Sequence, residues 1–389
     1  MATGDNILYG RHYRSGQPVR VIIDGGIINR IEELPSDSGS KYLIAPGLTD
    51  LQVNGYAGFD LNTEPLMPER VRDIAVRLWS EGVTTFFPTL ITNSKENTLR
   101  SVRAIAEACR IWPEAAEAVG GIHLEGPFIS REDGARGAHP AEYVRPPDFD
   151  LFSEWQEAAD GMIRIITLAP EWPGTADFIR RATAAGVIVA IGHTAATPEQ
   201  IREAVEAGAT LSTHLGNGSH QMLPRHRNYI WEQLAADELY ITFISDGFHL
   251  PDSVMKVFLR MKPDRAILVS DSTNFTGMAP GDYSTHIGGE VTLTGEGKLH
   301  MKGNPNMLAG SGLSLLHCVT TLVRKGLASP GEALDMAGIR PRSMARVPGL
   351  YGLRGGALAD LIMLEESAEG FRVAGTVKAG KTVFGSEQQ

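Results

Sequence analysis

The chain has 389 residues, 42% of them hydrophobic, and this length can bury a large core. A formal net charge of −10 argues against nucleic acid or an anionic membrane as the main partner. The two cysteines, Cys109 and Cys318, exclude a disulfide framework or zinc ribbon, so we expect reduced thiols and a cytoplasmic protein without a signal peptide or membrane span.

Strand-like runs stand at both ends of the chain. They cover residues 19–23, 26–31, 360–364 and 371–377. Asp24 and Gly25 separate the first two runs and form a hairpin signal. We expect the two ends to pair into one small β-sandwich domain, residues 1–45 and 350–389, beside a barrel domain of residues 46–349.

The middle of the chain alternates strand-like and helix-like runs. Strands are predicted to begin near Asp50, Thr84, Gly121, Ile163, Val187, Leu211, Tyr240 and Ala266. Helices are predicted over 68–81, 95–111, 175–185, 197–207, 251–261, 311–326 and 330–339. This α/β pattern predicts a (β/α)₈ TIM-like barrel. A doubly wound sheet is the alternative, but no Gly-x-Gly-x-x-Gly motif opens its first unit.

One long excursion interrupts this alternation at residues 274–309. Residues 289–294 and 298–301 predict a hairpin within it. A loop of this length beside the end of a strand is usually functional, so we expect it near the site.

Four strand-like runs finish on or close to a metal-binding or acidic residue: Glu125, His193, His214 and Asp271. The carboxyl ends of barrel strands open onto one face, so these side chains can converge there. Glu125, His193 and His214 match a catalytic zinc shell with a fourth position open to water. Asp271 would then act as general base and afterwards as general acid. Hydrogen-bonded strand ends, or a turn aspartate at Asp271, are the alternatives.

Two further histidines follow strands on the same predicted face. His249 ends the run between those of His214 and Asp271, and it could hydrogen-bond a substrate carbonyl and steady an oxyanion. Asp246 is interpreted as a structural turn partner. His139 lies on the loop after Glu125 and either contacts substrate or is an exposed loop residue.

The segment after His214 carries a candidate anion site. Backbone N–H groups around Asn217 and Gly218 could cradle an anion. Arg225 belongs to a basic cluster that could bind a phosphate bidentately. A solvated surface turn is the alternative.

Gln52 and Asn54 end the first barrel strand and lie on one face of it. Metal hydrolase barrels often place two histidines at this spacing. Amides are poor ligands for a transition metal, so the pair argues against a second tightly held ion.

Together these segments resemble the amidohydrolase superfamily and, within it, the N-acetylglucosamine-6-phosphate deacetylase family. The matching segments are 46–50, 52–55, 82–89, 123–128, 192–194, 213–217, 245–249, 270–273, 308–311 and 359–362. They run through almost the whole chain, and their order is more specific than any one of them.

The resemblance implies a metal-dependent enzyme that deacetylates an amino sugar phosphate. It implies one divalent ion, zinc or alternatively iron, cobalt or manganese, bound by Glu125, His193 and His214, with Asp271 as acid and base. The implied substrate contacts come from His139, Asn217, the Gly218 backbone, Arg225 and His249. It further implies a homodimer.

The chain departs from this family directly after Asn217, where Ala-Met is usual and Gly218-Ser219 stands here. The segment 218–228 should form the sugar-phosphate pocket, so a differently decorated N-acyl amino sugar is an alternative substrate. Two alternative hypotheses remain. The first is a related barrel enzyme that hydrolyses cyclic amides or acts as a deaminase, and the second is a non-catalytic sugar-binding relative. The retained Asp271 argues against the last.

Overall fold

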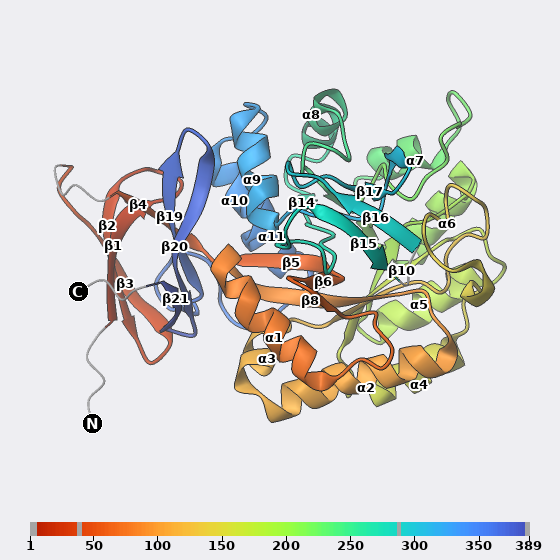
Figure 1. The fold of residues 1–389 in the computed structure, drawn as a ribbon, viewed down its shortest axis with the longest axis horizontal. Coiled ribbons are helices and arrows are strands. Elements are labelled where there is room, and N and C mark those ends of the chain that lie inside the picture. Colours follow the sequence, from red (N-terminus) through yellow and green to blue (C-terminus); the bar gives the residue numbers. More distant parts are fainter. Residues whose placement is uncertain (1–5, 37–40, 286–288, 386–389) are drawn as a thin grey trace.

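The structure is a computed structural model that describes residues 6–36, 41–285 and 289–385. Eight parallel strands form one sheet in the order β14-β13-β12-β11-β10-β9-β8-β5. The sheet lies in the larger body on the right of Figure 1, where β5, β8, β10 and β14 are labelled. Its strands are β5 (Leu48–Val53), β8 (Val83–Ile91), β9 (Ile122–Glu125), β10 (Ile163–Leu168), β11 (Ile188–Ile191), β12 (Leu211–Ser212), β13 (Tyr240–Phe243) and β14 (Ala266–Leu268). A parallel bridge between Val53 and Ser272 joins the last strand to the first. This closed sheet confirms the predicted barrel.

Helices cover the outside of the barrel. The seven predicted helices are present as α1 (Pro68–Leu78), α2 (Lys95–Ile111), α5 (Thr175–Ala184), α6 (Pro198–Ala207), α8 (Asp252–Met261), α9 (Leu315–Arg324) and α10 (Pro330–Ala337). Thr197 and Gln200 form a capping box at the start of α6, as their spacing suggests.

The sequence analysis missed four helices. They are α3 (Pro113–Ala118), α4 (Phe149–Ala158), α7 (Tyr229–Ala235) and α11 (Ile339–Met344). Three of them span two turns or fewer, too short for an amphipathic period to stand out. Helix α4 did carry a usable signal, because the Asp148 side chain accepts hydrogen bonds from the first-turn backbone. Two short 3-10 turns are also present: η1 (Trp79–Glu81) after α1, and η2 (Ala141–Tyr143) between β9 and α4.

The two ends of the chain pair into one seven-stranded sheet, in the order β21-β20-β19-β4-β1-β2-β3. Its strands are β1 (Asn6–His12), β2 (Pro18–Asp24), β3 (Ile27–Glu33), β4 (Tyr42–Pro46), β19 (Leu361–Ser367), β20 (Gly370–Lys378) and β21 (Lys381–Gly385). The β2–β3 turn contacts the β20–β21 turn at Gly26 and Gly380, so the sheet encloses a small core. The pairing of the ends is confirmed, although the strands form one continuous sheet; the domain boundaries stay a prediction.

A buried charge cluster joins this sheet to the barrel. Asp360, just before β19, accepts hydrogen bonds from Lys378 Nζ at 2.8 Å and Arg342 Nη1 at 3.3 Å. Arg342 Nη1 also donates to Thr85 Oγ1 on β8 at 2.8 Å. All three charged residues are at most 4% exposed. One carboxylate therefore compensates two cations that water cannot reach.

The excursion after β14 is a four-stranded antiparallel sheet. Its strands are β15 (Gly281–Thr285), β16 (Gly289–Leu293), β17 (Leu299–Met301) and β18 (Asn304–Leu308). The predicted hairpin is confirmed as β16 and β17. Both ends of the excursion meet at a bridge between Ser272 and Ser311, next to Asp271.

A second small antiparallel pair, β6 (Gly55–Tyr56) and β7 (Phe59–Asp60), follows β5. Among the residues that the structure describes, no helix combines the length and apolar character needed to cross a membrane.

Asp360→Asn should lower the free energy of unfolding by about 3–5 kcal/mol, because it leaves two buried cations without a counter-charge. Urea denaturation followed by fluorescence measures this change. Glu365→Gln is the control: this carboxylate pairs with Lys41 on the surface, and its loss should leave the urea midpoint unchanged. Equal midpoint shifts in both variants would contradict the role given to Asp360.

Candidate active site

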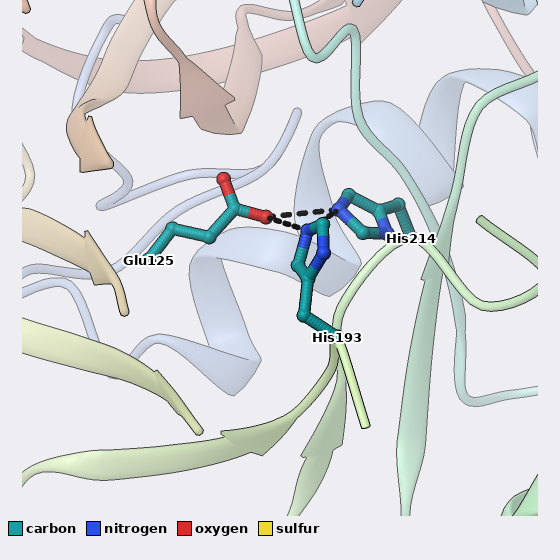
Figure 2. A group of neighbouring side chains, drawn as sticks. All are labelled: Glu125, His193 and His214. Atoms are coloured by element: carbon teal, nitrogen blue, oxygen red, sulfur yellow. Dashed lines mark hydrogen bonds and ion pairs between the residues drawn. The ribbon is translucent and has the colours of Figure 1, made fainter. Parts of the chain in front are cut away.

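The three predicted metal ligands meet at the carboxyl ends of neighbouring strands. Glu125 is the last residue of β9, and His193 and His214 each stand two residues beyond β11 and β12. Glu125 Oε1 lies 2.8 Å from His214 Nε2 and 3.1 Å from His193 Nε2. The two Nε2 atoms are 3.1 Å apart (Figure 2). All three side chains are buried, so the structure brings this set together as predicted.

The donor chemistry of this set fits a divalent cation. His193 Nδ1 faces the backbone oxygen of Ala135 at 3.0 Å, so Nδ1 carries the hydrogen and Nε2 presents a lone pair. Burial alone would raise the pKa of Glu125, but contacts with both histidines lower it well below its usual value. An ionised oxygen and two imidazole nitrogens within 4.8 Å of one another can bind one metal ion.

The backbone is strained at three of the four strand-end residues. His193, His214 and Asp271 have φ values of 49°, 27° and 49°, in the left-handed region that non-glycine residues rarely adopt. Such a conformation costs about 1–3 kcal/mol per residue and concentrates at functional sites. The strain turns these side chains toward one point, and the sequence carries no sign of it.

Small residues and a second histidine enclose the His193 ring. A Cβ atom on Gly218 would lie 2.6 Å from His193 Nδ1, and Gly218 has a φ of 54°, so a larger residue there would displace the ring. The His139 ring centroid is 4.4 Å from that of His193. His139 is buried and lies 2.8 Å from Thr92 Oγ1 through Nδ1. Burial lowers the pKa of His139 to about 3, and the alternative of an exposed loop residue is wrong.

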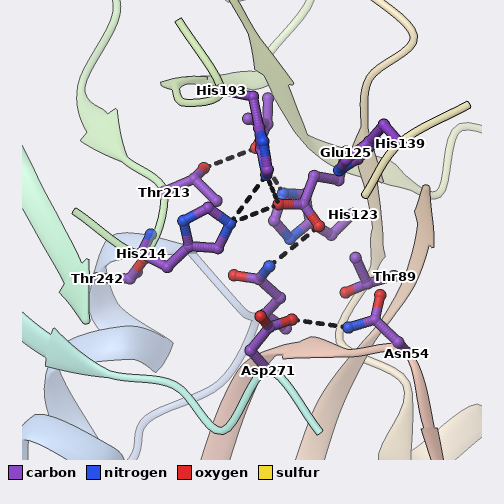
Figure 3. Close-up of polar contacts among 12 residues, drawn as sticks. Asn54, Thr89, His123, Glu125, His139, His193, Thr213, His214, Thr242 and Asp271 are labelled. Atoms are coloured by element: carbon purple, nitrogen blue, oxygen red, sulfur yellow. Dashed lines mark hydrogen bonds and ion pairs between the residues drawn. The ribbon is translucent and has the colours of Figure 1, made fainter. Parts of the chain in front are cut away.

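Each carboxylate of the site receives a hydrogen bond from an amide. Asn54 Nδ2 donates to Asp271 Oδ1 at 2.7 Å (Figure 3). Gln52 Nε2 donates to Glu125 Oε2 at 3.0 Å. Burial, followed by the negative charge of Glu125, raises the pKa of Asp271 to about 6. In the sequence the two amides stand out only as missing metal ligands, and nothing there marks these contacts.

His249 is paired with Asp246 rather than with the triad. Its Nδ1 lies 2.7 Å from Asp246 Oδ2, and both Phe248 and His249 donate backbone N–H groups to Asp246 Oδ1. Burial opposes ionisation of Asp246, but the interactions with His249 prevail and lower the pKa of this carboxyl to about 2. The turn role predicted for Asp246 is confirmed, and the carboxylate also orients the His249 ring.

The segment 218–228 divides between the site and the surface. Asn217 donates its backbone N–H to His214 O at 2.9 Å, and its buried Nδ2 has no hydrogen-bond partner among the residues that the structure describes. His220 then joins Glu132 through Nε2 at 3.1 Å. Arg225, farther along, is exposed and makes no hydrogen bond or ion pair with the described part of the chain. The structure therefore does not bring Arg225 to the triad.

His123 is a buried polar residue that the sequence analysis did not assign. It lies on β9, two residues before Glu125, with Nδ1 3.0 Å from Leu51 O and Nε2 2.7 Å from Thr167 Oγ1. Both ring nitrogens are already engaged, so His123 is a structural member of the barrel interior rather than a fourth ligand.

A family model for the amidohydrolase family matches residues 43–383. The chain belongs to the amidohydrolase family. It is 33% identical to N-acetylglucosamine-6-phosphate deacetylase from Bos taurus, over 92% of this chain and 87% of the relative. N-acetylgalactosamine-6-phosphate deacetylase from Escherichia coli O157:H7 is 30% identical, over 88% of this chain and 89% of the relative. These relatives place the chain among the amino sugar phosphate deacetylases of the family.

Solved structures agree with this assignment. A mutant N-acetyl-D-glucosamine-6-phosphate deacetylase from Mycobacterium smegmatis, in complex with N-acetyl-D-glucosamine-6-phosphate, matches with a TM-score of 0.85 and 26% identity. The match covers 98% of this chain and all of that one. A 5-methylcytosine deaminase from Klebsiella pneumoniae has a TM-score of 0.59 at 14% identity and shares the fold alone.

His214→Gln should weaken Zn²⁺ binding at least tenfold, because it removes one of three buried ligand atoms. Metal retained after dialysis against a graded chelator, measured by elemental analysis, gives the affinity. His123→Gln is the matched control, since it changes a buried histidine of the same barrel end that lies outside the ligand set. Equal metal loss in both variants would refute the assignment of His214.

Proposed function

We propose that this hydrolase removes the acetyl group of N-acetylglucosamine-6-phosphate and releases acetate and glucosamine-6-phosphate. The observation that carries the proposal is that the carboxylates of Glu125 and Asp271 are held by different amide side chains. Glu125 completes a ligand set, while Asp271 stands beside it with its own amide partner. This division, in a chain related to deacetylases over nearly its whole length, supports acetamide hydrolysis.

We further propose one divalent cation, zinc, as the resident metal, with iron, cobalt or manganese as alternatives for the same ligands. Glu125, His193 and His214 would hold it. Bound there, the cation would polarise the acetamide carbonyl and lower the pKa of water.

Asp271 would move the proton through the reaction. It takes a proton from the attacking water as the new C–O bond forms, and it returns a proton to the amine as the C–N bond breaks. Its pKa of about 6 allows a deprotonated base near neutral pH and a competent acid in the next step.

His249 would donate a hydrogen bond to the oxygen on which negative charge develops. The Asp246 carboxylate beside Nδ1 supports this role, because it holds the ring in one orientation. His139, Asn217 and the Gly218 backbone would contact the sugar, and the unpaired Asn217 Nδ2 is a ready donor.

Arg225 would bind the phosphate at the rim of the site. Its exposed position suits a doubly charged group that stays partly in water. We also propose a homodimer in the cytoplasm. Two thiols without a disulfide suit a reducing compartment.

N-acetylgalactosamine-6-phosphate is a second candidate substrate. The 30% identity to an N-acetylgalactosamine-6-phosphate deacetylase favours it, and the 218–228 segment carries the chain's clearest departure from the family pattern. The two sugars differ at one hydroxyl, which a substrate pocket can discriminate by hydrogen bonding.

The decisive measurement is acetate release from N-acetylglucosamine, N-acetylgalactosamine and N-acetylmannosamine, each with and without the 6-phosphate, in the presence of Zn²⁺. The highest kcat/KM should belong to N-acetylglucosamine-6-phosphate. Acetate release from none of the six would overturn the proposal.

Asp271→Asn should lower kcat by about 10²–10⁴-fold while Zn²⁺ affinity stays within a factor of three, because the side chain moves protons without belonging to the ligand set. Rates and chelator competition measure the two effects. Asp264→Asn, a surface carboxylate near β14, is the control and should retain full activity. Unchanged turnover in Asp271→Asn would remove Asp271 from this role.

A further inference from the structure

Two amides, Gln52 and Asn54, stand at the end of β5, and each faces a different carboxylate. Gln52 is 1% exposed and donates to the outer oxygen of Glu125, Oε2, while Oε1 faces both histidines. Asn54 donates to Oδ1 of Asp271, so Oδ2 remains for another partner. The alternation of the strand places both amides on the same side, one for each acid.

The orientation of both amides follows from hydrogen-bond chemistry. An ionised carboxylate only accepts hydrogen bonds, so the amide nitrogen must face it and the amide oxygen must face elsewhere. Gln52 Oε1 and Asn54 Oδ1 are both buried without a hydrogen-bond partner among the described residues. A buried acceptor without a partner lowers the stability of the folded state. Both oxygens are therefore suited to accept hydrogens that a bound water or an acetamide N–H brings.

We propose that Gln52 and Asn54 are positioning residues with separate tasks, in which Gln52 fixes the oxygen that Glu125 presents to the cation and Asn54 fixes the oxygen that Asp271 presents to water. This inference rests on the proposed function. The two amides occupy positions where other metal hydrolase barrels have histidines. In this one-metal site they would contribute through their own hydrogen bonds.

The two tasks have different energetic consequences. Glu125 is a ligand, and the loss of a hydrogen bond to a ligating carboxylate typically lowers metal affinity 10- to 100-fold. Asp271 is not a ligand, so the loss of its amide partner should leave metal affinity unchanged and reduce proton transfer. A merely structural contribution of either amide would change stability without separating these two quantities.

The test compares Gln52→Met with Asn54→Leu. Zn²⁺ affinity of the metal-free proteins is measured by chelator competition, and kcat and its pH profile are measured on the fully loaded enzymes. Gln52→Met should lose 10- to 100-fold in Zn²⁺ affinity, and its loss of kcat when fully loaded should be smaller than that of Asn54→Leu. Asn54→Leu should keep wild-type affinity, lose about 10- to 100-fold in kcat and shift the limb of the pH profile that reports Asp271.

Matched controls come from two buried amides outside the site. Gln233 donates to Tyr229 O at 2.9 Å and Asn97 donates to Asn93 Oδ1 at 3.2 Å, and each has a buried amide oxygen that accepts no hydrogen bond within the described part of the chain. Gln233→Met and Asn97→Leu should change thermal stability only. If the apolar variants at the site fail to fold, Gln52→Asn and Asn54→Gln keep the amide, shift it by one methylene and should give the same separation.

Two results would overturn the inference: both site variants losing affinity and kcat together, or both matching their controls. Failure of the proposed function looks different. In that case the wild-type protein releases no acetate, while the predicted affinity loss of Gln52→Met is still measurable without any substrate.

Discussion

Three possible ligand atoms that face one point are the constraint on which the rest of this site depends. Glu125 Oε1 and two imidazole nitrogens lie about 3 Å apart in a buried site, an arrangement that a cation between them would stabilise. The barrel brings these three atoms together because three of its parallel strands end at one face. The left-handed backbone at His193 and His214 and the close packing of Gly218 then keep the rings from turning away.

The division of labour between the two acids follows from their surroundings. Histidine contacts lower the pKa of Glu125, whereas burial and the charge of Glu125 raise that of Asp271. Two carboxyl groups of nearly equal intrinsic acidity thus acquire different protonation behaviour within one cavity. A third carboxylate, that of Asp246, lies nearby and is paired with the imidazole ring of His249.

Sequence patterns were sufficient for the barrel, the joined ends and the convergence of Glu125, His193 and His214, because each depends on periodicity or on a residue type at a strand end. They could not indicate the left-handed φ values, since nothing in the identity of His193 or Asp271 marks a strained backbone. They also missed the hydrogen bonds of Gln52 and Asn54, which link positions 73 and 217 residues apart in the chain. Sequence patterns also could not decide whether Arg225 lies in a pocket or at the surface, because a basic cluster looks the same in both places.

The excursion that follows β14 leaves and re-enters the barrel at nearly one place. Ser311 donates its backbone N–H to Asp271 O, and Thr273 donates to Ser311 O, so the base of the insertion is closed by backbone hydrogen bonds. Its own apolar core, around Phe275 and Val291, makes it a self-contained unit. Such an insertion can change in length or composition over evolution without altering the geometry of the acid at its root. The position of Asp271 is therefore set by the base of the insertion and does not depend on its outer strands.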